Sequence, residues 1–197
     1  MENCHQEMTD KELARAVASG GRAEFDEIVR RYCGPLTMFA VGKTRTFQDA
    51  EDIVQETFLR VYQNINSFDS KFSFENWLFT IAYRIIVSGY RKKQPQRLRD
   101  KASAQLAADE PERQDNQWVW GAAREMGIEA YTVLWLRYKR GMSTSEIAKV
   151  MKKTKITVRV LLHRSRVRLM KQITEQPETA ERSRWIRGGA VFIERTK

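Results

Sequence analysis

A polar stretch in the middle of the chain limits how this sequence can fold. Residues 94–117 read QPQRLRDKASAQLAADEPERQDNQ, with two prolines and almost no large apolar side chain. Such a segment cannot bury enough apolar surface to belong to a core, and its composition is typical of a flexible linker. The sequence therefore predicts two parts, residues 1–93 and 118–174, joined by this linker and followed by a tail of unassigned role at 175–197.

Both parts show the periodicity of amphipathic helices, and no alternating run is long enough to require a sheet. Helices are predicted at 10–19, 22–42, 46–67, 74–93, 117–125, 128–139, 144–152 and 155–174. The fold class is thus all-α, with two small helical domains joined by a flexible linker. The last two helices and the short turn between them predict a helix-turn-helix. Lys152, Lys153 and Thr154 occupy that turn, where a glycine is usual.

Charge is distributed unevenly along the chain. The chain carries 35 Lys and Arg against 25 Asp and Glu, a net charge of +10. Residues 134–174 hold 12 basic residues and 1 acidic residue, a net +11, and residues 77–108 hold 7 and 1, a net +6. Two basic blocks indicate two contact regions on a polyanion such as nucleic acid, and a solvated helix face is the simpler alternative for each block.

Several classes of protein are not expected from this sequence. No apolar run is long enough to span a membrane, and the polar start MENCHQEMTDKE is not a signal peptide, so we expect a cytoplasmic protein without membrane insertion. Two cysteines and two histidines are too few to favour a zinc site. No phosphate loop or hydrolase motif is present, so we expect neither an enzyme nor a cofactor.

The helix predicted at 46–67 has two contrasting faces. Its core face consists of Phe47, Ala50, Val54, Phe58, Val61 and Ile65. Its outward face carries Asp49, Asp52, Glu56, Arg60 and Gln63. Solubility alone accounts for an outward face of this kind, and docking of a basic protein surface is the alternative.

The helix predicted at 74–93 has an unusual second face. Phe74, Trp77, Leu78, Ile81 and Ile85 form its core face. The other side presents Phe79, Thr80, Tyr83, Arg84, Val87, Tyr90 and Arg91. Aromatic residues interleaved with arginines suit stacked bases and phosphates, and packing against another helix is the alternative.

The last predicted helix, 155–174, is basic. Val158, Leu162, Ser165 and Leu169 are expected to face inward, flanked by Lys155, Arg159, Arg164, Arg166 and Arg168. The outermost positions are Ile156, Val160, His163 and Val167, of which three are apolar. These three predict either a protein-binding stripe or packing between the two domains, and a rotated helix with the three residues in the core is the alternative.

The motifs together resemble a known family. DAEDIVQETFLRVYQNINSF (49–68) and FENWLFTIAYRIIVSGYRKK (74–93) are similar to the first conserved domain of bacterial extracytoplasmic-function sigma factors. EIAKVMKKTKITVRVLLHRSRVRL (146–169) is similar to their second domain. The order of the motifs and the linker between them make the resemblance specific, and it covers about two-thirds of the chain.

The resemblance implies a dissociable initiation subunit of RNA polymerase. It implies docking on core RNA polymerase by Asp49, Asp52, Gln55, Glu56 and Arg60. It implies melting of the promoter −10 element and capture of an unstacked base by Phe68, Lys71, Phe72, Thr80, Tyr83, Arg84, Val87, Ser88 and Arg91. It implies recognition of −35 duplex DNA by Lys155, Thr157, Arg159, Val160, His163, Arg164 and Arg166.

The resemblance also implies an inhibitory partner, because family members are commonly held inactive by an anti-sigma factor. Ile156, Val160 and Val167 are the residues expected to bind it. The chain departs from the family at Arg84, at Ser88-Gly89 and at Val160-Leu161, so the promoter bases preferred by the family do not carry over. A helix-turn-helix repressor or a response-regulator output protein would explain residues 128–174 but not 46–93, and an RNA-binding or structural adaptor would explain only the charge.

Overall fold

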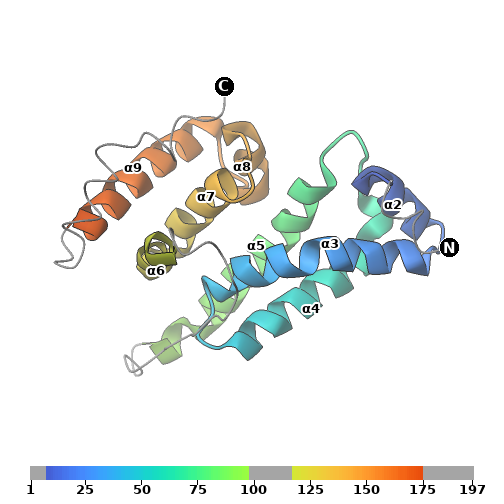
Figure 1. The fold of residues 1–197 in the computed structure, drawn as a ribbon, viewed down its shortest axis with the longest axis horizontal. Helices are drawn as coiled ribbons and strands as arrows, with labels where there is room; N and C mark the ends of the chain where they lie inside the picture. Colours follow the sequence, from blue (N-terminus) through green and yellow to red (C-terminus); the bar gives the residue numbers. More distant parts are fainter. Residues whose placement is uncertain (1–7, 98–116, 175–197) are drawn as a thin grey trace.

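The computed structural model describes residues 8–97, here called the first half, and residues 117–174, the second half. Helices α2 to α5 and a short 3-10 helix form the first half, and α6 to α9 form the second (Figure 1). Their bounds are α2 Asp10–Ala18, α3 Arg22–Val41, α4 Phe47–Asn64, η1 Ile65–Ser67, α5 Phe74–Arg97, α6 Gln117–Glu125, α7 Ile128–Tyr138, α8 Thr144–Met151 and α9 Lys155–Thr174. The predicted all-α class is confirmed for this part of the chain.

Side-chain caps explain why the helices begin where the sequence predicts. The Thr46 hydroxyl accepts a hydrogen bond from the Asp49 amide at 3.0 Å, which starts α4. Ser143 and Glu146 form a reciprocal capping box at the start of α8. The Thr154 hydroxyl accepts from the Thr157 amide at 3.1 Å and starts α9. These local signals fix helix starts without any tertiary contact.

The end of α5 differs from the prediction. The helix was expected to stop at Gln94-Pro95, but it continues through Pro95 to Arg97. A proline removes only one amide donor, and its fixed φ is compatible with helical backbone, so a helix can include one near its end. Pro35 likewise lies inside α3 without ending it. The predicted linker therefore begins later than expected, and residues 98–116 lie outside the described residues, as does the tail at 175–197.

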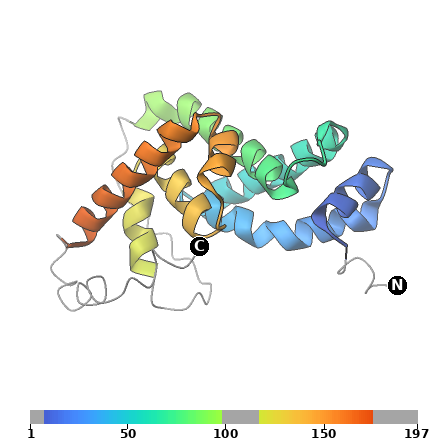
Figure 2. The same ribbon diagram turned by 90° about the horizontal axis from the view of Figure 1, so that it is seen from above.

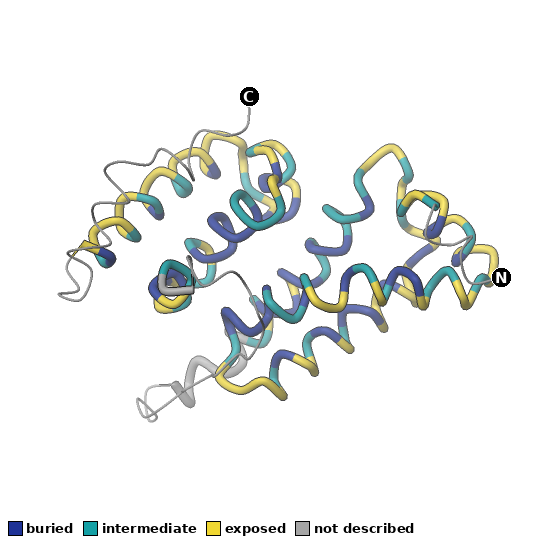
Figure 3. The backbone as a smooth tube through the Cα atoms, viewed as in Figure 1, coloured by how far each residue is buried: buried dark blue, intermediate teal, exposed yellow. Residues whose placement is uncertain are grey.

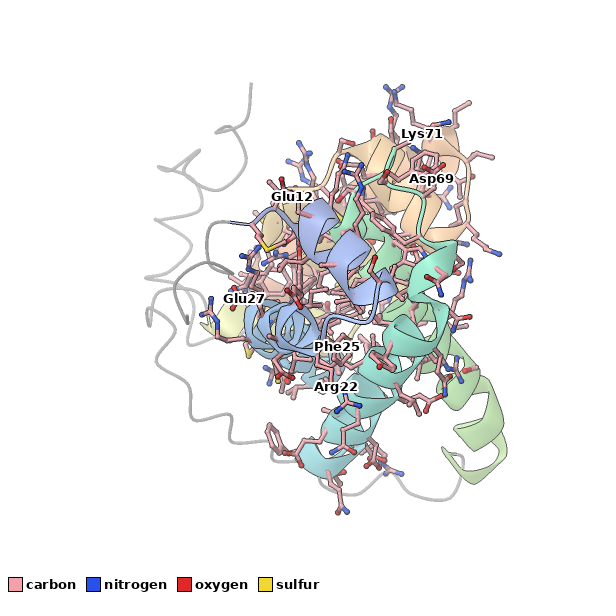
Figure 4. All side chains as sticks on the ribbon, turned by 90° about the vertical axis from the view of Figure 1, so that its right-hand side faces the viewer. Glu12, Arg22, Phe25, Glu27, Asp69 and Lys71 are labelled. Atoms are coloured by element: carbon pink, nitrogen blue, oxygen red, sulfur yellow. The ribbon has the colours of Figure 1, made fainter. Side chains whose placement is uncertain are left out.

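In the first half, α3, α4 and α5 pack around one apolar core. Ile28, Leu36 and Phe39 of α3 are buried, as are Ala50, Val54 and Val61 of α4. Phe25 lies between α3 and α4, with its ring edge-on to Phe58 at 6.4 Å between centroids (Figure 4). Phe47 was expected in this core, but 52% of its surface is exposed. It is the first residue of α4, where the helix has only begun to approach its neighbours.

A cluster of charged and hydrogen-bonded side chains connects α2 to α3. The Tyr32 hydroxyl donates to Asp10, and Arg31 donates to Asp10 at 3.0 Å and to Glu27 at 2.6 Å. Hydrogen bonds from Arg30 and then Arg31 lower the pKa of Glu27 to about 2. Burial and the hydrogen bond to Asp10 raise the pKa of the Tyr32 phenol above its usual range. Each charged group in the cluster has an opposite partner, so their partial burial is tolerated.

The second half packs directly on the first. Helices α6 to α9 gather beside α3 and α5, while α2 lies at the opposite end of the molecule (Figures 1 and 2). Buried residues of both halves, including Phe39, Phe79 and Trp135, belong to one hydrophobic cluster. Buried residues lie on α3 and α5 of the first half and on α7 and α8 of the second half, where the two halves meet (Figure 3). The sequence did not predict this joint, because each contacting surface belongs to a different part of the chain.

The turn of the helix-turn-helix contains a strained residue. Lys152 ends α8 with φ 50° and ψ 47°, the left-handed region that normally favours glycine. This explains how the turn closes without the glycine that is usual there.

Replacing Lys152 with glycine should stabilise the protein. Left-handed backbone costs an L-residue roughly 1–2 kcal/mol, and glycine removes this cost. Glycine also raises the conformational entropy of the unfolded chain, which offsets part of the stabilisation. We expect Lys152→Gly to raise the free energy of unfolding by about 0.5–1 kcal/mol, measured by urea denaturation. Lys152→Ala is the matched control, because alanine removes the charge but keeps the strain. Equal stability of the two variants would contradict the backbone explanation.

Candidate nucleic-acid interface

Helix α9 is anchored by a narrow inward face. Val158 is fully buried and Ser165 is buried, while Leu162 and Leu169 are half-buried against α6, α7 and α8. These four are the inward positions that the sequence predicts. Ile173, near the end of the helix, is also buried and was missed, and most of the other side chains of α9 are exposed.

The predicted −35 residues lie on that outer surface. Six of the seven are exposed, namely Lys155, Thr157, Arg159, Val160, His163 and Arg164, and Arg166 is half-buried. Four basic side chains thus surround the start and middle of the second helix of a helix-turn-helix. In such motifs this helix enters the major groove and its flanking cations contact phosphates.

An apolar stripe also runs along the outside of α9. Ile156 is 73% exposed, Val160 44% and Val167 57%. The alternative that these residues belong to the core is wrong, and so is the expectation that they pack the two domains together in this structure. Met170, 37% exposed, extends the stripe and was missed, although it follows Val167 at helical spacing. The stripe therefore lies on the open surface of α9 and not in the core.

The predicted acidic face of α4 is at the surface. Asp52, Gln55 and Arg60 are exposed, and Asp49 and Glu56 are half-buried. Arg60 forms an ion pair with Glu56 at 2.6 Å, one helical turn apart. The face therefore keeps an excess of negative charge around a single paired cation.

An exposed leucine lies in the middle of this acidic face and was missed. Leu59 is 52% exposed and projects between Asp52 and Gln63, because positions 52, 59 and 63 share one side of the helix. With Tyr62, Phe25 and Arg22 it lines a shallow groove between α4 and the start of α3 (Figure 4). An apolar centre with a charged rim is the usual composition of a protein-binding surface.

The predicted −10 residues on α5 divide into two groups. Arg84 and Ser88 are exposed, and Thr80 and Val87 are half-buried. Tyr83, however, is only 8% exposed, and Phe79 is fully buried. Phe79 was expected on an open face, and that expectation is wrong, because Trp135 of α7 packs on its ring at 5.3 Å. The side chain of Arg91 lies outside what the structure describes.

The loop before α5 holds the other predicted −10 residues. Lys71 is exposed and lies near Asp69 at one end of the molecule (Figure 4). Phe68 is half-buried, with its ring edge-on to Phe74 at 5.3 Å. Phe72 is 50% exposed, and the Lys149 ammonium of α8 lies 4.5 Å from its ring centroid. An exposed phenylalanine beside two lysines can stack on a base and contact its phosphate.

Residues 8–97 and 117–174 contain neither a metal-binding cluster nor a membrane-spanning helix. No group of three or more histidine, cysteine, aspartate or glutamate side chains there could hold a metal ion. None of the helices described is both long and apolar enough to cross a bilayer. The surfaces that remain are the basic face of α9, its apolar stripe, the acidic face of α4, and α5 with its preceding loop.

These features define a helical protein with a basic helix-turn-helix, and the comparisons give its family. A family model for Sigma-70 region 2 matches residues 28–96, from α3 to the end of α5. The ECF RNA polymerase sigma factor SigW of Bacillus subtilis is 29% identical over 185 residues, covering 86% of this chain and 99% of SigW. The chain belongs to the extracytoplasmic-function (ECF) RNA polymerase sigma factors.

Solved structures agree with this assignment. CnrH, solved in complex with the cytosolic domain of CnrY, has a TM-score of 0.65 and 25% identity, covering 84% of this chain and 97% of CnrH. RpoE of Bartonella quintana, solved with the anti-sigma factor NepR, also has a TM-score of 0.65, at 22% identity over 78% of this chain and 98% of RpoE, and supports the fold. The chain is therefore an RNA polymerase sigma factor that acts in transcription initiation, and the repressor alternative is not favoured.

Proposed function

We propose that this sigma factor contacts core RNA polymerase and promoter DNA through three separate surfaces. The acidic face of α4, Asp49, Asp52, Gln55, Glu56 and Arg60, docks on core RNA polymerase. The α5 helix and its loop bind the melted −10 strand through Phe68, Lys71, Phe72, Thr80, Tyr83, Arg84, Val87, Ser88 and Arg91. Helix α9 binds −35 duplex DNA through Lys155, Thr157, Arg159, Val160, His163, Arg164 and Arg166.

The outward placement of the basic residues of α9 is the observation that carries this proposal. Val158 is fully buried while Arg159 and Arg164 are exposed, so the helix has one orientation and its cations face solvent. On the second helix of a helix-turn-helix, such cations fit DNA phosphates. The Sigma-70 region 2 match across α3 to α5 supports the other two surfaces.

We further propose a two-domain division, residues 1–93 and 118–174, and action in the cytoplasm, where promoter DNA and polymerase are present. The factor itself performs no chemistry and needs no cofactor, because polymerase supplies the catalytic centre. An anti-sigma factor binds the stripe of Ile156, Val160 and Val167. The exposure of this stripe supports that assignment. The structure of CnrH in complex with the cytosolic domain of CnrY supports it too, because it shows a similar protein bound to a protein partner.

In vitro transcription tests the proposed function. Core polymerase with this chain should initiate at a limited set of positions on sheared genomic DNA, mapped by the 5′ ends of the transcripts. Core polymerase alone should give no such set. A chain that only lowers transcription driven by another sigma factor would be a repressor, and the proposal would fail.

A further inference from the structure

We propose that the C-terminal tail, residues 175–197, binds the apolar stripe of α9 in the same chain and covers part of the face that meets −35 DNA. The stripe here includes Met170. The inference rests on the proposed function only in taking α9 as the −35 helix, and the contact between tail and stripe does not depend on that role. It gives a partner to a part of the sequence that the three proposed surfaces leave unused.

The stripe has the spacing of a helix side on which a second segment packs. Its positions follow one another at alternating intervals of four and three residues, as in a coiled-coil seam. The exposed residues at these positions are Ile156, Val160, His163, Val167, Met170 and Thr174. Because a helix rises about 1.5 Å per residue, the apolar part from Ile156 to Met170 is about 21 Å long. Four large apolar side chains in one exposed line favour contact with another segment.

The tail carries large apolar side chains that none of the proposed surfaces covers. Residues 175–184 read EQPETAERSR and hold no large apolar side chain, whereas residues 185–193 read WIRGGAVFI. The five large apolar residues of this second part are Trp185, Ile186, Val191, Phe192 and Ile193. Burial of such side chains is favourable, so they and the stripe complement each other. The tail thus divides into a polar spacer, 175–184, and an apolar contact segment, 185–193.

The spacer is long enough to return the contact segment along α9. Its ten residues separate Thr174, the last residue of α9, from Trp185. Ten extended residues span at most about 36 Å, which exceeds the length of the stripe. A short tether also holds the contact segment at an effective concentration of the order of millimolar, so a weak contact is enough to fill the stripe.

Charge favours the tail over a second copy of the chain as the occupant. Helix α9 has six basic side chains and no acidic one, and exposed Arg159 and Arg164 lie on the two sides of the stripe. The first seven residues of the spacer, 175–181, hold three acidic side chains and no basic one. Two copies of α9 packed along their stripes would instead place like charges opposite each other, which is unfavourable.

A tail in this position competes with duplex DNA. Val160 belongs both to the stripe and to the proposed −35 contacts, and His163, another of those contacts, lies on the same side of α9. These side chains cannot contact the tail and the major groove together, so the apparent affinity for duplex DNA falls by the uncovered fraction. The anti-sigma factor proposed for the same stripe must displace the tail as well.

Photocrosslinking of the full chain tests the contact itself. Benzoylphenylalanine in place of Phe192 forms a covalent bond on illumination with whatever lies beside it, and mass spectrometry of the peptides identifies the partner. We expect a product of monomer size that joins position 192 to residues 156–170. Val167→Ser with Met170→Ser, at exposed positions of the stripe, should reduce this product severalfold. Phe47→Ser with Tyr62→Ser, which removes two exposed aromatic side chains of α4, is the matched control and should leave the product unchanged.

Binding of a short fluorescent duplex of mixed sequence tests the competition. Val191→Ser with Phe192→Ser removes apolar surface from the tail and changes no charge. This variant should bind the duplex about tenfold more tightly than the wild type, as expected if roughly nine molecules in ten are covered. Ser183→Ala with Thr196→Ala alters the same tail without removing a large apolar side chain and should bind like the wild type. Unchanged helicity by circular dichroism confirms that each variant is folded.

The two readouts separate the possible failures. A product with a second copy or with the first half, or the absence of a product with α9, would overturn the tail contact and leave the proposed function untouched. A product with α9 but unchanged duplex affinity in the Val191/Phe192 variant would overturn the competition. Arg159→Ala with Arg164→Ala then decides about α9 itself, because weaker duplex binding keeps α9 as the DNA helix and equal binding removes it. A product with α9 together with tighter duplex binding supports the proposal.

Discussion

Reversing two charges on α4 should abolish binding to core RNA polymerase. Asp52 is exposed and Glu56 half-buried, on a helix whose other side is fixed by Ala50, Val54 and Val61. Placing like charges across a complementary interface costs several kcal/mol, so Asp52→Lys with Glu56→Lys should weaken binding by at least about a hundredfold. Fluorescence anisotropy of labelled sigma factor titrated with core polymerase measures the change.

A second reversal separates a local effect from one of net charge. Glu125→Lys with Glu129→Lys makes the same total change at two exposed positions of the second half, away from this face. The control should bind core polymerase nearly as well as the wild type and should unfold at a similar temperature. Wild-type affinity in the Asp52/Glu56 variant would show that α4 does not dock on polymerase.

Leu59 adds an exposed apolar side chain to the acidic face of α4. Charged pairs at an interface set orientation and association rate more than affinity. An apolar side chain that is 52% exposed at the centre of such a face can supply affinity by burial, since the centre of an interface is drier than its rim. In the proposed docking on polymerase, this face would therefore offer both charged contacts and one apolar contact.

The helices could be predicted because their signals are local. Hydrophobic spacing and the Thr46, Ser143 and Thr154 caps are all contained within a few residues, and the structure has the corresponding helices. The inward side of α9 followed from the same spacing, and Val158 is indeed fully buried. Two helix ends were misplaced: α5 continues through Pro95 to Arg97, and α4 stops at Asn64, where a 3-10 helix over Ile65–Ser67 takes its place.

The joint between the halves could not be predicted, because its signals are not local. Phe79 and Tyr83 are aromatic residues on the second face of an amphipathic helix, a pattern that suits both DNA and a covering helix. Gly42 and Lys43 have no motif that marks them. Lys43 lies 4.7 Å from the centroid of the Tyr131 ring, and a Cβ atom on Gly42 would lie 2.0 Å from the same ring, a contact between residues remote in sequence.

The basic face of α9 should dominate the affinity for duplex DNA. Arg159 and Arg164 are exposed and flank the inward line of Val158 and Ser165. If each contacts a phosphate worth about 1 kcal/mol, Arg159→Ala with Arg164→Ala should weaken binding of the full chain to a short duplex roughly thirtyfold. Because the lost contacts are electrostatic, the difference from wild type should shrink as salt is raised.

The salt dependence identifies the kind of contact that was lost. Each phosphate contact contributes about 0.9 to the slope of log affinity against log salt, so removing two should make the slope shallower by about 1.8. Lys11→Ala with Arg22→Ala removes the same charge from exposed positions of the first half and should change the slope little. A weaker complex with an unchanged slope would mean that the arginines read base edges or support the fold. An unchanged affinity would remove α9 from the DNA interface.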